Sequence, residues 1–247
     1  MDRIEEVKKK REFSKLPDSI VGRALEKSER DVKDARAFLR KYFGVFLTNK
    51  VLKGVEEEVL GSHASSKNRD YEEFYGKIFE RIGEVSSIID LGCGVNGFSY
   101  PFLKKILGRV SYIGVEASGQ VADNVNFYFV ENNFDGKVFC GDLFDLDFIE
   151  GVLKKALKPR VVFMLQVVDA LESFEKDFSK KLLKVVRENC EYLVVSWSKR
   201  SISGKKRFDV SRKWLVDFLK DNFMIEKDFE NWGERFLVLN SASNEFS

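Results

Sequence analysis

The chain has 247 residues, of which 44% are hydrophobic and 13% aromatic, and its formal net charge at pH 7 is only +2. This composition is that of a folded globular protein with a sizeable core, and it excludes an intrinsically disordered chain. No run of about 18 apolar residues occurs, and the first residues are too charged for a secretory signal. We therefore expect a cytoplasmic protein that does not bind membranes.

Thiol and imidazole groups are few. The chain contains three scattered cysteines, Cys93, Cys140 and Cys190, and a single histidine, His63. An odd number of unpaired cysteines is typical of reduced thiols rather than of a disulfide framework or a zinc site. The sequence therefore predicts no bound metal.

The front of the chain shows helical periodicity only. Apolar residues recur every three or four positions between Val32 and Phe46, and Asp31 is placed to cap the helix that they predict. Residues 1–53 carry 15 Lys and Arg against 9 Asp and Glu, so this part is near +6 and the remainder near −4. Such an excess is typical of a surface that binds a phosphate backbone, although a merely solvated face can also carry it.

From Ser87 onward, short β-rich runs alternate with amphipathic segments. The runs are SIIDL, YIGVEA, KVFCGD, VVFML, YLVVSW and RFLVL, and two helices are predicted from Asp177 to Asn189 and from Ser211 to Phe223. This alternation predicts an α/β fold with an open, mainly parallel, Rossmann-like sheet and right-handed crossovers. We therefore divide the chain into a helical N-terminal domain, residues 1–62, and an α/β domain, residues 63–247.

The stretch SSIIDLGCGVNGFSYPFL, Ser86 to Leu103, predicts a buried strand, a glycine turn and a helix. Gly92, Gly94 and Gly97 have the G-x-G-x-x-G spacing of dinucleotide-binding folds, in which backbone amides at a helix N-terminus receive a pyrophosphate. The spacing alone leaves the ligand open.

Carboxylates stand at the ends of three predicted strands in succession: Asp90 ends the first, Glu116 ends the second, and Asp142 follows the third. In open α/β sheets, ligands bind at the carboxyl ends of the strands. A dinucleotide explains Glu116 as a ribose ligand but not the other two acids. S-adenosyl-L-methionine uses all three: Asp90 near its cationic methionine end, Glu116 at the ribose hydroxyls, and Asp142 at the adenine amino group, with Leu143 covering the ring. We therefore favour methyl transfer over nicotinamide chemistry, with Gly92 and Gly94 forming the turn that holds this cofactor.

Four segments, in order along residues 10 to 240, carry a family resemblance: DVKDARAFLRKYFGVFL, SHASSKNRD, DLGCGVNGFSYPF and LVVSWSKRSISGKKR. The first is similar to the helix that closes an N-terminal RNA-binding region, and the second to a His-Ala-Ser-Thr-x-x-Arg segment. The third resembles an Asp-x-Gly-Cys-Gly-x-Asn-Pro motif, and the fourth a strand followed by a Ser-Leu-x-Gly-Arg loop. The family with these features is that of the small-subunit (16S) ribosomal RNA guanine-N7 methyltransferases of the aminoglycoside-resistance class.

The resemblance implies a monomeric enzyme that uses S-adenosyl-L-methionine and methylates ribosomal RNA or the small ribosomal subunit at N7 of a guanine. It matches Arg69 to the arginine that pairs with the methionine carboxylate, and it places Gln166 at a cofactor position where lysine is usual. Trp197 is a candidate for stacking on a base turned out of its helix. The phosphate-binding loop would contain Lys199, Arg200, Lys205, Lys206 and Arg207.

Two other function classes stay open. A small-molecule methyltransferase would share the motifs between residues 90 and 143 without needing a basic front or a basic loop. A non-catalytic RNA-binding protein with a relic pocket would bind RNA but not the cofactor. Because the motifs of the cofactor site all follow residue 60, we also expect that site to be independent of residues 1–60.

Overall fold

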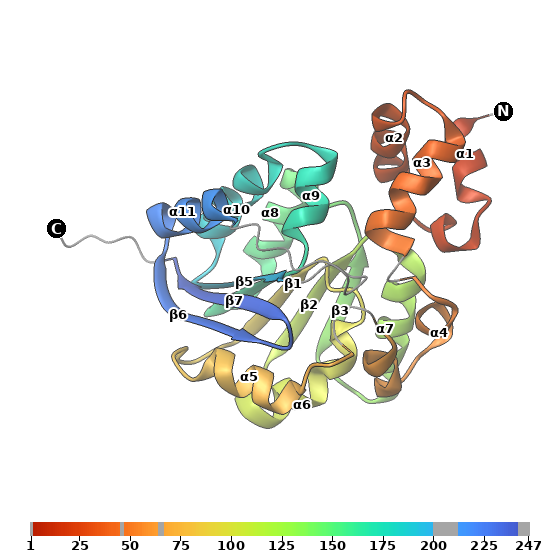
Figure 1. Ribbon diagram of the computed structural model, residues 1–247. Helices are drawn as coiled ribbons and strands as arrows, with labels where there is room; N and C mark the ends of the chain where they lie inside the picture. Colours follow the sequence, from red (N-terminus) through yellow and green to blue (C-terminus); the bar gives the residue numbers. More distant parts are fainter. Residues whose placement is uncertain (1, 45–46, 64–66, 200–211, 242–247) are drawn as a thin grey trace.

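The computed structural model of the chain describes residues 2–44, 47–63, 67–199 and 212–241. A seven-stranded sheet lies between two layers of helices, and a small helical unit packs beside it (Figure 1). The strand order is β3-β2-β1-β4-β5-β7-β6, and β7 runs antiparallel to both of its neighbours. The strands are β1 (Ser87–Leu91), β2 (Ser111–Glu116), β3 (Gly136–Cys140), β4 (Arg160–Leu165), β5 (Tyr192–Ser198), β6 (Met224–Asn231) and β7 (Glu234–Asn240).

The predicted α/β fold with a mainly parallel sheet is confirmed, and the six predicted runs are β1 to β5 and β7. The sequence did not reveal β6, an edge strand whose residues are exposed or only partly buried and which pairs with β7 alone. Because β7 is inserted between β5 and β6, the order departs from the 3-2-1-4-5-6 arrangement of dinucleotide-binding sheets.

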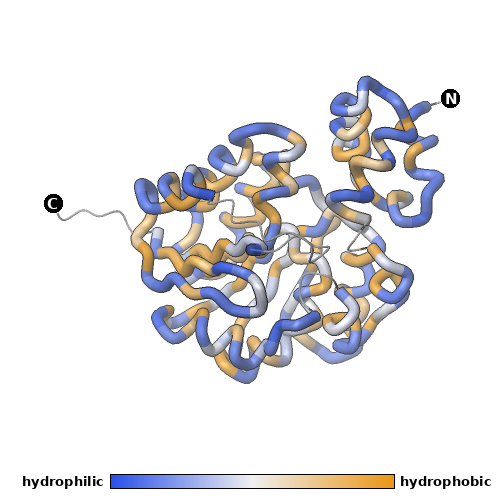
Figure 2. Tube along the Cα trace, in the orientation of Figure 1, coloured by the Kyte–Doolittle hydropathy of each residue, from blue (hydrophilic) through white to orange (hydrophobic). Residues whose placement is uncertain are grey.

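Alternate residues along each strand enter two different cores, as the pleat of a sheet requires. Ile88 of β1 belongs to the core under one helical layer, and Ile89 to the core under the other. Figure 2 shows this arrangement as hydrophobic strands enclosed by helices whose outer sides are hydrophilic. The first layer contains α4 (Asn49–Lys53), α5 (Tyr71–Phe79), α6 (Tyr100–Leu107) and α7 (Gly119–Glu131), and the second contains α8 (Leu146–Lys155), α9 (Val168–Phe174), α10 (Phe178–Asn189) and α11 (Lys213–Asn222).

The helical unit at the front has a core of its own. It consists of α1 (Arg3–Lys8), α2 (Asp18–Lys27), α3 (Val32–Leu39) and a π-helical turn, Arg40–Gly44. The carboxylate of Asp31 accepts a hydrogen bond of 2.8 Å from the Asp34 amide and caps α3, as the sequence predicts. None of the helices within the described ranges is long and apolar enough to cross a membrane.

Residues 47–62 pack with the sheet rather than with this front unit. Leu47, Val51 and Leu60 belong to the same hydrophobic core as α5, α6 and α7. The Tyr128 hydroxyl of α7 donates to the carboxylate of Glu57, at 2.8 Å. By side-chain packing, the front unit ends near residue 44 and the following residues belong to the α/β unit. The predicted domain boundary at residue 62 stays a prediction.

Candidate active site

The glycine turn after β1 requires glycine at two positions. Gly92 has a φ of +76° and Gly94 a φ of +50°, which side chains with a Cβ rarely adopt. A Cβ on Gly92 would lie 2.8 Å from Cγ2 of Val167, and one on Gly94 would lie 3.3 Å from Nε2 of His63. The turn therefore exposes backbone atoms, without side chains, to the pockets at the carboxyl ends of the strands.

The carboxylate that ends β2 holds this turn in place. Oε2 of Glu116 accepts a hydrogen bond of 2.9 Å from the Gly94 amide, and Oε1 accepts one of 2.8 Å from the Ser118 amide. The side chain is buried, and burial raises its pKa. Because each oxygen has a second lone pair, Glu116 can still accept from hydroxyl groups of a ligand.

Asp90, at the end of β1, is buried at 1% exposure beneath the turn. Its Oδ2 accepts hydrogen bonds from Nδ2 of Asn96, at 2.7 Å, and from the hydroxyl of Tyr112, at 2.8 Å. Burial raises the pKa of Asp90 to about 6, although these two hydrogen bonds and the charge of Arg69 oppose the rise. A carboxyl with this pKa readily gains a negative charge when a cation binds beside it.

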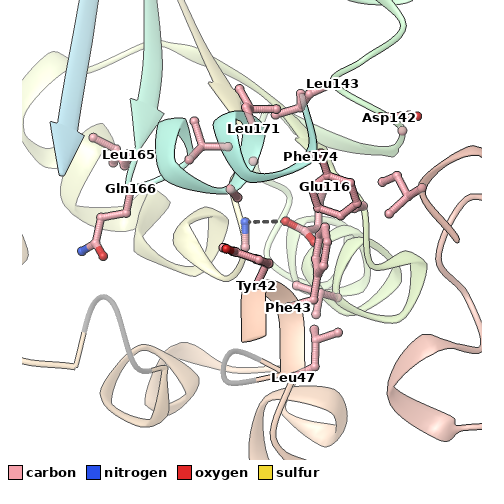
Figure 3. Close-up of a pocket in the computed structure, with 18 of the residues that line it drawn as sticks. Tyr42, Phe43, Leu47, Glu116, Asp142, Leu143, Leu165, Gln166, Leu171 and Phe174 are labelled. Atoms are coloured by element: carbon pink, nitrogen blue, oxygen red, sulfur yellow. Dashed lines mark hydrogen bonds between the residues drawn. The ribbon is translucent and has the colours of Figure 1, made fainter. Parts of the chain in front are cut away.

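The eight residues predicted to bind a cofactor line two adjoining pockets at the carboxyl ends of the parallel strands. The larger pocket, shown in Figure 3, and the smaller one share Gly92, Gly94 and Gln166. Of these two pockets, Glu116, Asp142 and Leu143 line only the larger one, and Arg69 and Asp90 line only the smaller one. The structure thus gathers residues that are as much as 97 positions apart, from Arg69 to Gln166.

The front unit also contributes to the larger pocket. Ile20, Tyr42 and Phe43 line it together with Leu47, and the last three face Glu116 in Figure 3. The hydroxyl of Ser19 in α2 donates to Oδ2 of Asp142 at 2.6 Å, while Oδ1 accepts from the Phe144 amide at 2.9 Å. The expectation that residues 1–60 are independent of this site is therefore wrong.

Helix α9 joins the front unit to the α/β unit. Phe174 packs edge-on against Phe38, with ring centroids 4.8 Å apart, and it also lines the larger pocket. The guanidinium of Arg23 lies 4.4 Å above the ring centroid of Phe144. The sequence did not show that Tyr42, Phe43 and Phe174 line the pocket. Apolar residues at helical spacing indicate that one face of a helix is buried, but they do not show which part of the protein covers that face.

Outside the pockets, the predicted site residues have different surroundings. Trp197 is 5% exposed and belongs to the core under α8 to α11, which favours the alternative of a core aromatic, and its stacking on a base stays a prediction. Lys199 is at the surface and pairs with Glu230 at 2.6 Å. The remaining predicted loop residues, Arg200, Lys205, Lys206 and Arg207, lie outside the described residues.

Comparisons with known proteins relate the sequence and the fold of this chain to those of RNA methyltransferases. No established family model matches the chain. A 16S rRNA (guanine(1405)-N(7))-methyltransferase from Proteus mirabilis is 41% identical over 61 residues, which are 24% of this chain and 22% of that protein. The chain thus matches less than a quarter of the length of this relative.

Two solved structures extend the likeness to the whole fold. The 16S rRNA methylase RmtB matches with a TM-score of 0.73 at 18% identity, over 97% of both chains. The 16S rRNA methyltransferase RmtF, in complex with S-adenosyl-L-homocysteine, matches with a TM-score of 0.76 at 17% identity, over 97% of this chain and 99% of that one. The chain therefore has the fold of these two 16S rRNA methyltransferases, and the resemblance identified in its sequence is confirmed at the level of the fold.

Proposed function

We propose that this protein is an S-adenosyl-L-methionine-dependent methyltransferase that modifies N7 of a guanine in small-subunit ribosomal RNA. The observation that carries the proposal is the convergence of three buried carboxylates, Asp90, Glu116 and Asp142, on one glycine turn. The match to an rRNA guanine-N7 methyltransferase from Proteus mirabilis supports the choice of target.

The residues of the two pockets fit this cofactor. Asp90 offers a carboxylate to the cationic methionine end, Glu116 offers acceptors to ribose hydroxyls, and Asp142 offers one to the adenine amino group. The walls beside Asp142 are apolar, because Leu143, Leu171 and other hydrophobic side chains line the larger pocket. Apolar walls with a few placed polar groups are typical of sites for nucleoside-sized ligands.

Methylation at N7 requires no acid or base from the protein, because the guanine N7 lone pair is nucleophilic and carries no proton. When bound, the cofactor supplies an activated methyl group on a sulfonium centre. The task of the protein is then to hold the two reactants in line, which contributes roughly 7–11 kcal/mol to lowering a barrier. The rigid turn at Gly92 and the backbone fixed by Glu116 serve this positioning.

RNA geometry gives a reason for the basic regions. N7 faces the deep and narrow major groove of an A-form helix, which side chains cannot read, so the base has to leave the stack. The front unit, with its excess of Lys and Arg, and the basic loop after β5 would grip the RNA on the two sides of the exposed base.

The proposal is tested by incubating the protein with tritiated cofactor and either 30S particles or free 16S RNA. We expect label in the RNA from the wild type and none from Asp90→Ala. A thermal shift with S-adenosyl-L-homocysteine but no labelled RNA would favour a small-molecule substrate. RNA binding without any thermal shift would favour a protein that only binds RNA.

Cofactor affinity is expected to depend on pH through Asp90. Its pKa of about 6 in the free protein means that it is protonated in acid and has to lose that proton to face a cation. Affinity for S-adenosyl-L-homocysteine, whose α-ammonium group is the cation at this end, should therefore change little between about pH 7 and 8 and fall by about tenfold per pH unit well below pH 6, measured by calorimetry.

Two observations distinguish Asp90 from other groups that could titrate in this pH range. Burial lowers the pKa of His63, which lines both pockets, to about 4, so this imidazole stays neutral across the window. Asp90→Asn should bind more weakly and lose the inflection near pH 6. An unchanged pH profile in that variant would show that another group titrates.

The basic loop is expected to hold phosphates. Neutralising Lys205, Lys206 and Arg207 together should lower the slope of log affinity for RNA against log salt concentration by roughly 2, at about 0.7–0.9 per contact. A matched control neutralises Lys154, Lys155 and Lys158, which are exposed where the chain enters the central strand β4, at the amino ends of the parallel strands and so opposite the pockets. Equal slopes for the two triple variants would contradict a role for the loop.

A further inference from the structure

A buried ion pair joins the segment before α5 to the start of β7. Nη2 of Arg69 donates to Oε1 of Glu234 at 2.8 Å and to Oε2 at 3.1 Å, and both side chains are only 3% exposed. The hydroxyl of Ser196 in β5 also donates to Oε2, at 3.0 Å. Three segments that are distant in the sequence therefore meet at the carboxylate of Glu234.

This ion pair uses only some of the hydrogen-bond donors of the Arg69 guanidinium. Nε of Arg69 is buried and has no hydrogen-bond partner among the described residues, although a buried donor without a partner costs about 1–3 kcal/mol. The flat face of the group lies 4.5 Å from the ring centroid of Phe74, which fixes its plane. A guanidinium held in this way retains donors for a second carboxylate.

The surroundings of Arg69 indicate where such a carboxylate would lie. Arg69 lines the smaller pocket together with Asp90 and Gln166. The carbonyl of Ser196 accepts a hydrogen bond of 3.0 Å from the Gln166 amide, so the same residue of β5 contacts Glu234 by its side chain and Gln166 by its backbone. Glu234 is thus connected to both sides of the smaller pocket.

Resting on the proposed function, we infer that Glu234 is a positioning residue: it holds the guanidinium of Arg69 in the orientation that binds the carboxylate of the methionine end of the cofactor. Buried ion pairs contribute little net stability compared with apolar residues of the same volume, so stability alone does not explain this pair. Glu234 is not among the residues that line the two pockets, so it acts through Arg69, with Ser196 fixing one of its oxygens.

The test compares two ligands that differ in the group that Arg69 would bind. S-adenosyl-L-homocysteine has the amino acid end, whereas 5′-methylthioadenosine lacks it. In Glu234→Gln, which keeps the shape but loses the charge, the affinity for S-adenosyl-L-homocysteine should fall at least tenfold, while the affinity for methylthioadenosine should stay within about twofold. Arg69→Lys should show the same selective loss, because an ammonium cannot reproduce the fork of donors.

If removal of the charge disturbs folding, two milder variants still test the inference. Ser196→Ala removes only one hydroxyl and should cause a smaller loss with the same selectivity, and Glu234→Asp should recover part of the affinity lost in Glu234→Gln. Equal losses for both ligands, or no loss for either, in variants with native melting temperatures would overturn the positioning role alone. If the wild type binds neither ligand, the proposed function fails as well.

Discussion

Replacing Gly92 by alanine is expected to lower the affinity for S-adenosyl-L-homocysteine at least tenfold and to destabilise the protein by about 2–5 kcal/mol. The φ of +76° costs a residue with a Cβ about 1–2 kcal/mol. The new methyl group would also lie 2.8 Å from Cγ2 of Val167, and relieving this overlap costs about 1–3 kcal/mol. Because Val167 lines the larger pocket, any shift that relieves the overlap also changes the ligand surface.

Gly108 provides a matched control for this substitution. It ends α6 with a φ of +72°, and a Cβ there would have no atom within 4 Å. Gly108→Ala should therefore lose about 1–3 kcal/mol of stability from backbone strain and leave cofactor affinity unchanged. Calorimetric binding and thermal unfolding measure both quantities. Native affinity in Gly92→Ala would show that the turn is not the cofactor surface.

Removal of the front unit, residues 2–44, is expected to weaken cofactor binding at least tenfold and to abolish methylation of RNA even at saturating cofactor. The first effect follows from the loss of Ile20, Tyr42 and Phe43 from the pocket wall and of the Ser19 hydroxyl from Asp142. The second follows from the loss of the basic surface that would grip the RNA. Binding is measured by calorimetry and methylation by incorporation of tritium.

Point variants separate these two effects. Phe43→Ala should weaken cofactor binding, because Phe43 lines the pocket and packs against Phe174, with ring centroids 6.1 Å apart. Lys33→Ala, on the exposed side of α3, should leave cofactor binding unchanged. If the truncated protein, shown by circular dichroism to be folded, binds the cofactor with native affinity, the front unit is not part of the site.

Much of the fold and of the pocket was predictable because the relevant signals are local. A buried apolar run before Gly92 predicts β1, and a carboxylate at the end of a parallel strand lies at the carboxyl end of the sheet. These two rules place Asp90, Glu116 and Asp142 together without knowledge of the complete fold. The glycines add a backbone requirement that can be seen in the sequence itself.

The remaining features depend on contacts between distant segments. Nothing adjacent to Ser19 or Tyr42 in the sequence shows that α2 and the turn after α3 close over the pocket. Glu234 begins a strand whose antiparallel pairing with β5 has no local signal, so its contact with Arg69, 165 positions earlier, appears only in the folded chain. The position of Trp197 could not be predicted for the same reason, because an aromatic residue at the end of a strand can either stack on a ligand or belong to the core.

The most direct test of the proposed function is to identify the methylated atom. The protein is incubated with tritiated S-adenosyl-L-methionine and 30S particles or free 16S RNA, and the RNA is then treated with borohydride and aniline, which cleave the chain at N7-methylguanosine. Primer extension should stop at one guanine of the 16S RNA, and this stop should be absent with Asp90→Ala. Incorporation of label without any cleavage at guanine would contradict N7 as the methylated atom, and the absence of label in either RNA substrate would contradict the proposed target.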